Sequence, residues 1–178
     1  IKRPNFLTLV GVISSIIILQ LSFIFTKKET QGQKEIIVYN MKKTTIISER
    51  NGTDVRIFCS DTVFKKSSRN TILNSYLTGN FSHLKKILKI KNALYLNNKR
   101  IYIIDSTGIC PKKMQPDILL LIQSPKINLD RILKNSHPKI IIADASNSYS
   151  VQKLWEKTCF RQKIPFHAVS EKGFYKLN

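Results

Sequence analysis

The chain has 178 residues, of which 30 are Lys or Arg and 11 are Asp or Glu, giving a formal net charge of +19. Such a charge favours anionic partners, either nucleic acid or anionic lipid headgroups, although scattered lysines also accumulate without a function in proteins of AT-rich genomes. Three isolated cysteines, Cys59, Cys110 and Cys159, show no CxxC or CxH spacing. This spacing excludes a zinc-finger signature and leaves small buried side chains, or one disulfide in an oxidising compartment, as their roles.

The N-terminal part contains one long apolar segment. Residues 6–25, FLTLVGVISSIIILQLSFIF, carry no charge, and at about 1.5 Å per residue they match the ~30 Å hydrocarbon core of a bilayer. We predict a transmembrane helix within residues 1–27 and a juxtamembrane linker at 28–34. A signal peptide is the alternative, but Thr26-Lys27-Lys28-Glu29 follows where a small-x-small cleavage site would stand. Basic residues flank both ends, so charge alone does not fix the orientation.

Residues 35–178 have the length of one ordinary domain, which we predict to be α/β, with a mixed sheet and flanking helices. The chain begins with Ile1 rather than Met, so we expect it to be a piece of a longer protein. In the first half of the domain, alternating and turn-forming residues indicate short strands, among them an antiparallel meander, and one helix. The predicted strands are 35–40, 44–47, 54–59, 93–96 and 100–105, the helix is 67–77, and 83–91 fits either type.

The last third of the chain alternates apolar strands with helices. The strand predicted at 117–122 and the next at 139–143 are joined by a helix at 129–134 that Asn128 can cap, so these two strands are expected to be parallel. A longer helix begins at Ser148 or Ser150 and ends near Gln162, with Val151, Leu154, Trp155 and Cys159 expected on one face. Residues 165–169 and 173–177 are predicted to pair with each other around a turn at Glu171-Lys172-Gly173.

The order of these last segments resembles a known family. DILLLIQSPKINL, HPKIIIADAS, LWEKTC and KIPFHAVSEKGFY are similar to the C-terminal metallo-β-lactamase-like domain of ComEC-type competence proteins, the inner-membrane channels for DNA uptake, and most of all to the versions in the Bacteroidetes. The resemblance is good over 100–178, weak over 34–99, and consistent with residues 6–25 as a channel helix. It implies one transmembrane helix followed by a truncated, degenerate metallo-β-lactamase-like α/β domain at 35–178.

The resemblance also implies what this chain lacks. Active enzymes of that fold hold two metal ions with a His-x-His-x-Asp-His cluster and further His and Asp ligands, which generate hydroxide. Here the three histidines, His83, His137 and His167, are far apart in sequence, and the loop that carries His-His-Gly-Ser in the family reads Ile122-Gln123-Ser124-Pro125. We therefore expect no metal, no cofactor and no enzymatic activity.

Polar residues nevertheless follow three of the apolar strands, where ligands of α/β sheets usually bind. They form a predicted polar rim: Asp105, Ser106, Thr107, Gln123, Ser124, Asp144 and Ser146. Capping of neighbouring turns explains them most simply. A remnant substrate-contacting surface, or a hydrolase with an atypical site at Asp105 and Asp144, is the alternative.

Together, the charge and the resemblance predict a non-catalytic accessory domain of a DNA-uptake channel, on the periplasmic side of the bacterial inner membrane. Its expected partners are DNA, the remaining helices of the channel and the membrane. Binding to phosphates through lysines would be independent of base sequence and sensitive to salt. The candidate DNA contacts are Lys65, Lys66, Arg69, Lys85, Lys86, Lys89, Lys91, Lys112 and Lys113. A solvated lysine face on a domain that only caps the channel is the alternative.

Overall fold

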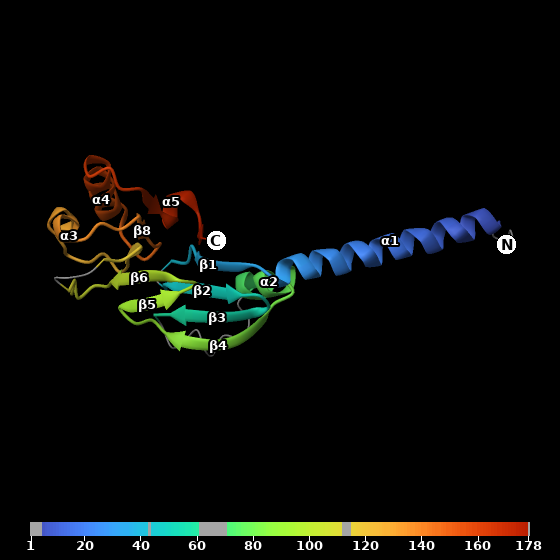
Figure 1. Ribbon diagram of the computed structural model, residues 1–178. Helices are drawn as coiled ribbons and strands as arrows, with labels where there is room; N and C mark the ends of the chain where they lie inside the picture. The colour runs from blue at the N-terminus through green and yellow to red at the C-terminus, as the bar shows by residue number, and fades with distance from the viewer. Residues whose placement is uncertain (1–4, 43, 61–70, 112–114, 178) are drawn as a thin grey trace.

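The computed structural model describes residues 5–42, 44–60, 71–111 and 115–177. Within these residues, one long helix leads into a domain built on two five-stranded sheets (Figure 1). Both sheets contain parallel and antiparallel neighbours, which confirms the predicted α/β class with mixed strands and helices. The strands of the mixed arrangement are divided between the two sheets.

The long N-terminal helix, α1 (Phe6–Gln31), contains the predicted apolar segment. By length and composition it can cross a membrane, and none of its residues is buried against the protein. The helix continues for six residues beyond the apolar segment, because Thr26 to Gln31 include no helix breaker. The expected linker at 28–34 is therefore largely helical, and only Gly32 and Gln33 separate α1 from the first strand.

The first sheet has the order β10-β1-β2-β3-β4. The meander of β1 (Lys34–Val38), β2 (Ile46–Asn51) and β3 (Asp54–Cys59) is antiparallel, as predicted. The ambiguous segment forms β4 (His83–Lys89), which runs parallel to β3. On the other side, β10 (Tyr175–Leu177) pairs antiparallel with β1. The first and the last strand of the domain in sequence, β1 and β10, are therefore neighbours in this sheet.

The second sheet has the order β5-β6-β7-β8-β9. The hairpin of β5 (Ala93–Leu96) and β6 (Lys99–Ile104) turns at two asparagines in the left-handed region, as in a tight hairpin turn. Three parallel strands follow: β7 (Ile118–Leu121), β8 (Ile140–Ala143) and β9 (Phe166–Ala168). The parallel pairing predicted for the strands at 117–122 and 139–143 is confirmed.

Among the residues described, the domain also contains four helices: α2 (Thr71–Gly79), α3 (Leu129–Asn135), α4 (Tyr149–Arg161) and α5 (Val169–Lys172). Each sheet buries one face against the other sheet and one against helices, since the apolar residues divide into three clusters. The central cluster joins Ile36, Ile47 and Phe58 of the first sheet to Ile103, Leu120 and Ile142 of the second. The outer clusters pack α2 on the first sheet, and α3 with α4 on the second. The domain is thus a four-layered sandwich.

Two local predictions are wrong. The segments at 165–169 and 173–177 do not pair with each other: β9 joins the second sheet, β10 joins the first, and α5 connects them. Leu154 does not share the buried face of α4 with Trp155 and Cys159 but is 61% exposed. Asn128 does cap α3, since its Oδ1 accepts the Arg131 backbone N–H at 3.0 Å.

The domain has two ends that differ in their distance from α1. At the helix end, the backbone N–H of Gly52 in the β2–β3 turn donates to the Gln33 carbonyl at 3.0 Å, and Asn97 of the β5–β6 turn contacts Glu49 and Arg50. The strands β3, β4 and β6 begin there and run away from α1 (Figure 1). The polar residues that follow β6, β7 and β8 therefore lie at the far end of the domain.

Candidate nucleic-acid interface

The strand β4 lies at one edge of the first sheet, opposite β10, and carries most of the described lysine candidates. Its residues Lys85, Lys86 and Lys89 are exposed, and Lys91 follows two residues after the strand. Leu88 and Ile90 pack towards the core between the sheets, while Ile87 packs towards α2. The apolar residues hold the strand in the sheet, and the lysines flank its free backbone edge. Lysines on an edge strand also hinder edge-to-edge aggregation, which is the purely structural explanation.

These lysines differ in their ionic partners. Lys85 forms an ion pair with Asp54, whose other carboxylate oxygen lies 2.9 Å from His83 Nε2. The hydrogen bond from Lys85 lowers the pKa of the Asp54 carboxyl, so the pair is ionised together and its charges largely cancel. In contrast, no ion pair among the described residues involves Lys86, Lys89 or Lys91. These three lysines, which we call the basic edge, remain available to an external anion.

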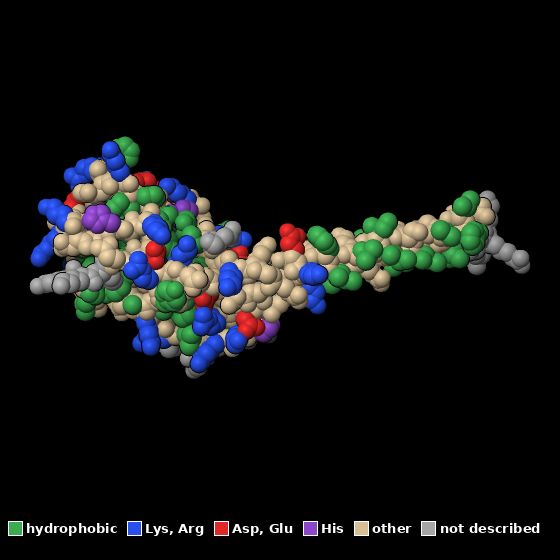
Figure 2. Space-filling view, in the orientation of Figure 1, with side chains coloured by type: hydrophobic (Ala, Val, Ile, Leu, Met, Phe, Trp, Pro, Cys, Tyr) green, Lys and Arg blue, Asp and Glu red, His purple; other side chains and the backbone are tan. Residues whose placement is uncertain are grey.

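The other candidates lie outside the described residues: Lys65, Lys66, Arg69, Lys112 and Lys113. Basic side chains are also spread over the rest of the visible surface of the domain (Figure 2). The basic edge is therefore one region of a broadly cationic surface. It differs from the rest in that three lysines without an ion pair to the described residues lie within residues 86–91.

The predicted polar rim is assembled at the far end by direct hydrogen bonds between the loops. The Gln123 backbone N–H donates to Ser146 Oγ at 2.7 Å, and the hydroxyl of Ser106 donates to Gln123 Oε1 at 3.3 Å. The backbone N–H of Ser124 donates to Asn147 Oδ1 at 2.8 Å. Gln123 and Ser124 both have a positive φ, of 59° and 49°, which is unusual for residues with side chains. The loop after β7 is thus held in a strained shape by the loop after β8.

Asp144 lies at the centre of this network and is 1% exposed. Its Oδ1 accepts from the hydroxyl of Ser146 at 2.5 Å and from Asn147 Nδ2 at 2.9 Å, while its Oδ2 accepts from the hydroxyl of Thr45. Burial raises the pKa of this carboxyl, although the hydrogen bonds from Ser146 and Thr45 oppose the change. Because Thr45 precedes β2, Asp144 joins the two sheets at the far end.

Asp105 has a different environment. Its Oδ1 accepts from the backbone N–H of Thr107 at 3.0 Å and from the Thr107 hydroxyl at 2.6 Å, which closes a turn after β6. The Thr107 hydroxyl bond lowers the pKa of Asp105, so this carboxyl stays ionised at neutral pH. Both rim carboxylates are therefore engaged in hydrogen bonds within the protein, as expected for groups that cap turns.

The three histidines lie in three separate parts of the domain. His83 starts β4, His137 follows α3 and is exposed, and His167 on β9 contacts the Gly173 carbonyl at 3.0 Å. Within the ranges that the structure describes, no three His, Cys, Asp or Glu side chains come close enough together to hold a metal ion.

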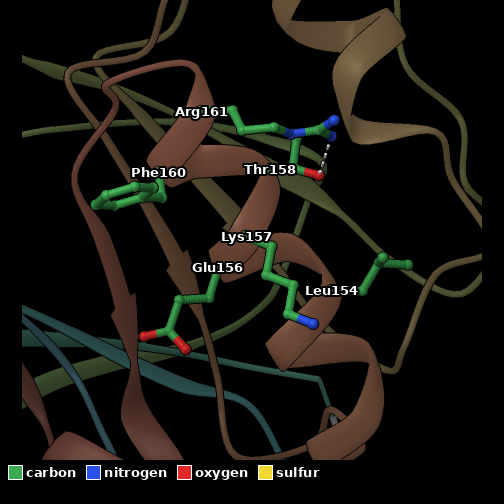
Figure 3. Close-up of a pocket in the computed structure, with 6 residues that line it drawn as sticks. All are labelled: Leu154, Glu156, Lys157, Thr158, Phe160 and Arg161. Atoms are coloured by element: carbon green, nitrogen blue, oxygen red, sulfur yellow. Dashed lines mark hydrogen bonds between the residues drawn. The ribbon is translucent and has the colours of Figure 1, made fainter.

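A surface hollow of about 700 Å³ lies along the outer face of α4 (Figure 3). Its lining side chains come from one helix and spread to two sides of it, with Phe160 and Glu156 on one side and Lys157 and Leu154 on the other. The ring of Phe160 is 85% exposed. These groups do not converge on a common point, so the hollow has no arrangement suited to chemistry.

The profile of the ComEC C-terminal domain matches residues 36–178, most of the chain. This chain belongs to the ComEC family. Its role is accordingly in competence DNA uptake at a membrane, and α1 is the described helix able to span one. No curated protein and no solved structure matches it.

The ComEC domain contains a group of buried charges at the helix end that was not predicted from the sequence. Arg50 is fully buried and forms an ion pair with Glu35 at 2.9 Å, and Glu35 also pairs with Lys176 at 2.5 Å and accepts from the Tyr76 hydroxyl. Burial works to raise the pKa of Glu35, but its bonds with Lys176 and Tyr76 and the charge of Arg50 lower it overall. The sequence signal was the presence of two charged residues in each of two apolar strand segments, KEIIV and IISERN.

In the ComEC domain the basic edge has a defined direction relative to α1. The start of β4 lies beside the β2–β3 turn, because the His83 backbone N–H donates to the Thr53 carbonyl at 2.8 Å. The strand then runs parallel to β3, away from α1, so Lys86, Lys89 and Lys91 lie successively farther from the helix end. The basic edge therefore forms a track that leads from the far end of the domain towards α1.

Proposed function

We propose that this ComEC domain guides incoming DNA to the uptake channel, without cleaving it, by binding its phosphates along the basic edge. The observation that carries the proposal is the basic edge: exposed lysines on and just after β4, without an ion pair to the described residues, along the axis between the far end and α1. The domain lies on the periplasmic side in this proposal, where DNA has not yet crossed the membrane. The remaining helices of the channel are its partners within the membrane.

The geometry of the basic edge suits a phosphate backbone. Extended chain advances about 3.3 Å per residue, so Lys86 to Lys91 cover roughly 17 Å. A DNA strand carries one phosphate per about 3.4 Å of duplex axis, so this length faces several phosphates. Since the lysine side chains are long and flank the strand edge on both faces, they fit a mobile, sequence-independent contact. Few aromatic side chains adjoin them, which argues against base stacking.

The absence of cleavage in this proposal is supported by the polar rim. Asp144 is buried among donors from Ser146, Asn147 and Thr45, and Asp105 closes its own turn, so neither carboxylate has the open coordination that a catalytic metal requires. A hydrolase acting through these two carboxylates would lose all turnover in an Asp105→Asn, Asp144→Asn variant. Intact DNA after incubation of the unaltered protein with Mn²⁺ is the expected result.

Salt-dependent DNA binding tests the proposal. The whole chain, reconstituted in nanodiscs of uncharged lipid, is titrated with labelled single- and double-stranded DNA at several salt concentrations. We compare it with a Lys86→Gln, Lys89→Gln, Lys91→Gln variant. The matched control removes three exposed lysines from the opposite side of the sandwich, as Lys126→Gln, Lys134→Gln, Lys157→Gln.

Each phosphate contact adds about 0.9 to the slope of log K against log salt on duplex DNA, so we expect the edge variant to lower this slope by about 2 to 3. The control should change it by less than half as much. Equal effects of the two variants on the slope would show that DNA binding depends on the net charge of the protein and not on the basic edge. No binding of the unaltered chain even at low salt would favour the alternative, a domain that caps the channel without touching DNA.

A further inference from the structure

The junction between α1 and the domain is tightly packed. An ideal Cβ on Gly52 would lie 2.8 Å from the carbonyl oxygen of Gln31, the last residue of α1, so the β2–β3 turn directly abuts the end of the helix. Two residues before Gly52, Arg50 Nη2 donates to Gln33 Oε1 at 2.8 Å. The connection is therefore short, and β2 and the β2–β3 turn contact it at two points.

A second contact reaches farther back along α1. The ring of Phe81, in the loop between α2 and β4, packs edge-on against the ring of Phe23 with centroids 5.0 Å apart. Phe23 lies eight residues before the end of α1, which corresponds to about 12 Å along the helix axis. It also lies within the apolar segment, two residues from its end at Phe25. The α2–β4 loop thus extends to the level at which α1 becomes apolar.

The backbone of this loop has an unusual conformation at Phe81. Phe81 has φ of 49°, the left-handed conformation that usually requires glycine at the end of a helix. The Ser82 backbone N–H donates to the Leu77 carbonyl at 2.9 Å, which closes the end of α2 around Phe81. Phenylalanine at such a position is unfavourable by roughly 1 kcal/mol or more. Its contact with Phe23 is the described interaction that accounts for its presence there.

The neighbouring residues have the chemistry of a membrane interface. Leu84, three residues later, is a large apolar side chain that is 37% exposed, and Lys27 and Lys28 of α1 lie next to the apolar segment. Apolar side chains at the boundary of the acyl chains, with lysines extending to the headgroups, are typical of segments that rest in the interface.

We infer that Phe81 of the α2–β4 loop and Leu84 at the start of β4 insert into the lipid interface beside α1 and so fix the domain on the membrane surface. The inference requires α1 to span the membrane but is independent of DNA contact. The lipid layer between water and the acyl chains is about 5–7 Å thick on each side. Six residues of α1 beyond the apolar segment cover about 9 Å. The loop bridges this interval by folding back towards the membrane.

Fluorescence quenching by brominated lipid tests this inference. The whole chain is reconstituted in phosphatidylcholine vesicles whose acyl chains carry bromine near the headgroup. A Phe81→Trp variant is compared with Phe160→Trp, an exposed phenylalanine on the outer face of α4, and with the unaltered chain, whose single tryptophan, Trp155, is buried. We expect the emission added by Phe81→Trp to be quenched and blue-shifted, while that added by Phe160→Trp remains unquenched.

Equal quenching of the two added tryptophans, or no quenching of either, would overturn the inference. If Phe81→Trp does not fold, Leu84→Trp carries the same test, since its side chain is already partly exposed. A further variant, Phe81→Asn, keeps a residue that tolerates the left-handed conformation but removes the ring. In that variant we expect a tryptophan at Leu84 to lose most of its quenching, whereas unchanged quenching would show that Phe81 is not the anchor.

Discussion

Asp144 connects the loops at the far end of the domain through hydrogen bonds. Its two carboxylate oxygens accept hydrogen bonds from side chains on both sheets, so its role is to join loops rather than to receive a ligand. Replacement by alanine would leave the buried Asn147 amide and Thr45 hydroxyl without this acceptor. We expect Asp144→Ala to lower the free energy of unfolding by about 3 kcal/mol, measured by thermal or urea unfolding of the reconstituted chain.

Asp144→Asn is the matched control and has a distinct pH dependence. Burial raises the pKa of this carboxyl above 3.8, so the folded chain holds its proton to higher pH than the unfolded chain. Ionisation of Asp144 therefore lowers stability as pH rises from about 4 through the raised pKa. In Asp144→Asn this fall should disappear, with stability at pH 7 close to that of the unaltered chain. The same pH dependence in both proteins would assign the effect to another group.

At the scale of elements, the β2–β3 turn couples α1 to the first sheet. Gly52 has φ of 65° and lies against the Gln31 carbonyl, so a side chain there meets both an unfavourable backbone and a backbone oxygen. We expect Gly52→Ala to lower the free energy of unfolding by about 2 kcal/mol. Gly79→Ala, at the end of α2 with no atom within 4 Å of the new Cβ, should change it by less than about 0.5 kcal/mol. Similar losses in both variants would contradict the described junction.

The same scale shows what sequence patterns can and cannot predict. The β3 strand, the asparagine turn between β5 and β6 and the Asn128 cap were predictable, because each depends on alternation or turn chemistry within a few residues. The partners of β9 and β10 were not predictable. The sequences of these two short strands fit a hairpin as well as they fit separate places in two sheets. Long-range pairing depends on which apolar faces meet across the core.

The candidate site shows the same limit. The sequence placed the rim residues after apolar strands, and parallel pairing of β6, β7 and β8 does bring the loops after them together. Thr45 could not be identified, because it lies 99 residues from Asp144 in the chain and joins it only when the sheets stack. Likewise, the charge of Lys85 is neutralised by Asp54 only because β3 pairs with β4. A local pattern of lysines does not reveal this pairing.

At the scale of the whole molecule, the end of the domain next to α1 differs from the far end. The helix end holds the buried ion pairs and the α2–β4 loop, and the far end holds the polar rim. The basic edge runs between them along β4, an edge strand of the first sheet (Figure 1). A cationic track that approaches a membrane helix is what a guide for an anionic polymer requires, and a lipid-anchored helix end would hold that track in one orientation.

Natural transformation by cells that carry the altered chain tests this account most directly. The host is given either Lys86→Glu, Lys89→Glu, Lys91→Glu or, as the control of equal charge, Lys126→Glu, Lys134→Glu, Lys157→Glu, with both proteins present at the level of the unaltered one. Reversal along the basic edge should reduce the transformation frequency by about tenfold or more, since several phosphate contacts become repulsions. The control should transform nearly normally. Undiminished transformation by cells with the reversed edge would contradict DNA guidance along β4.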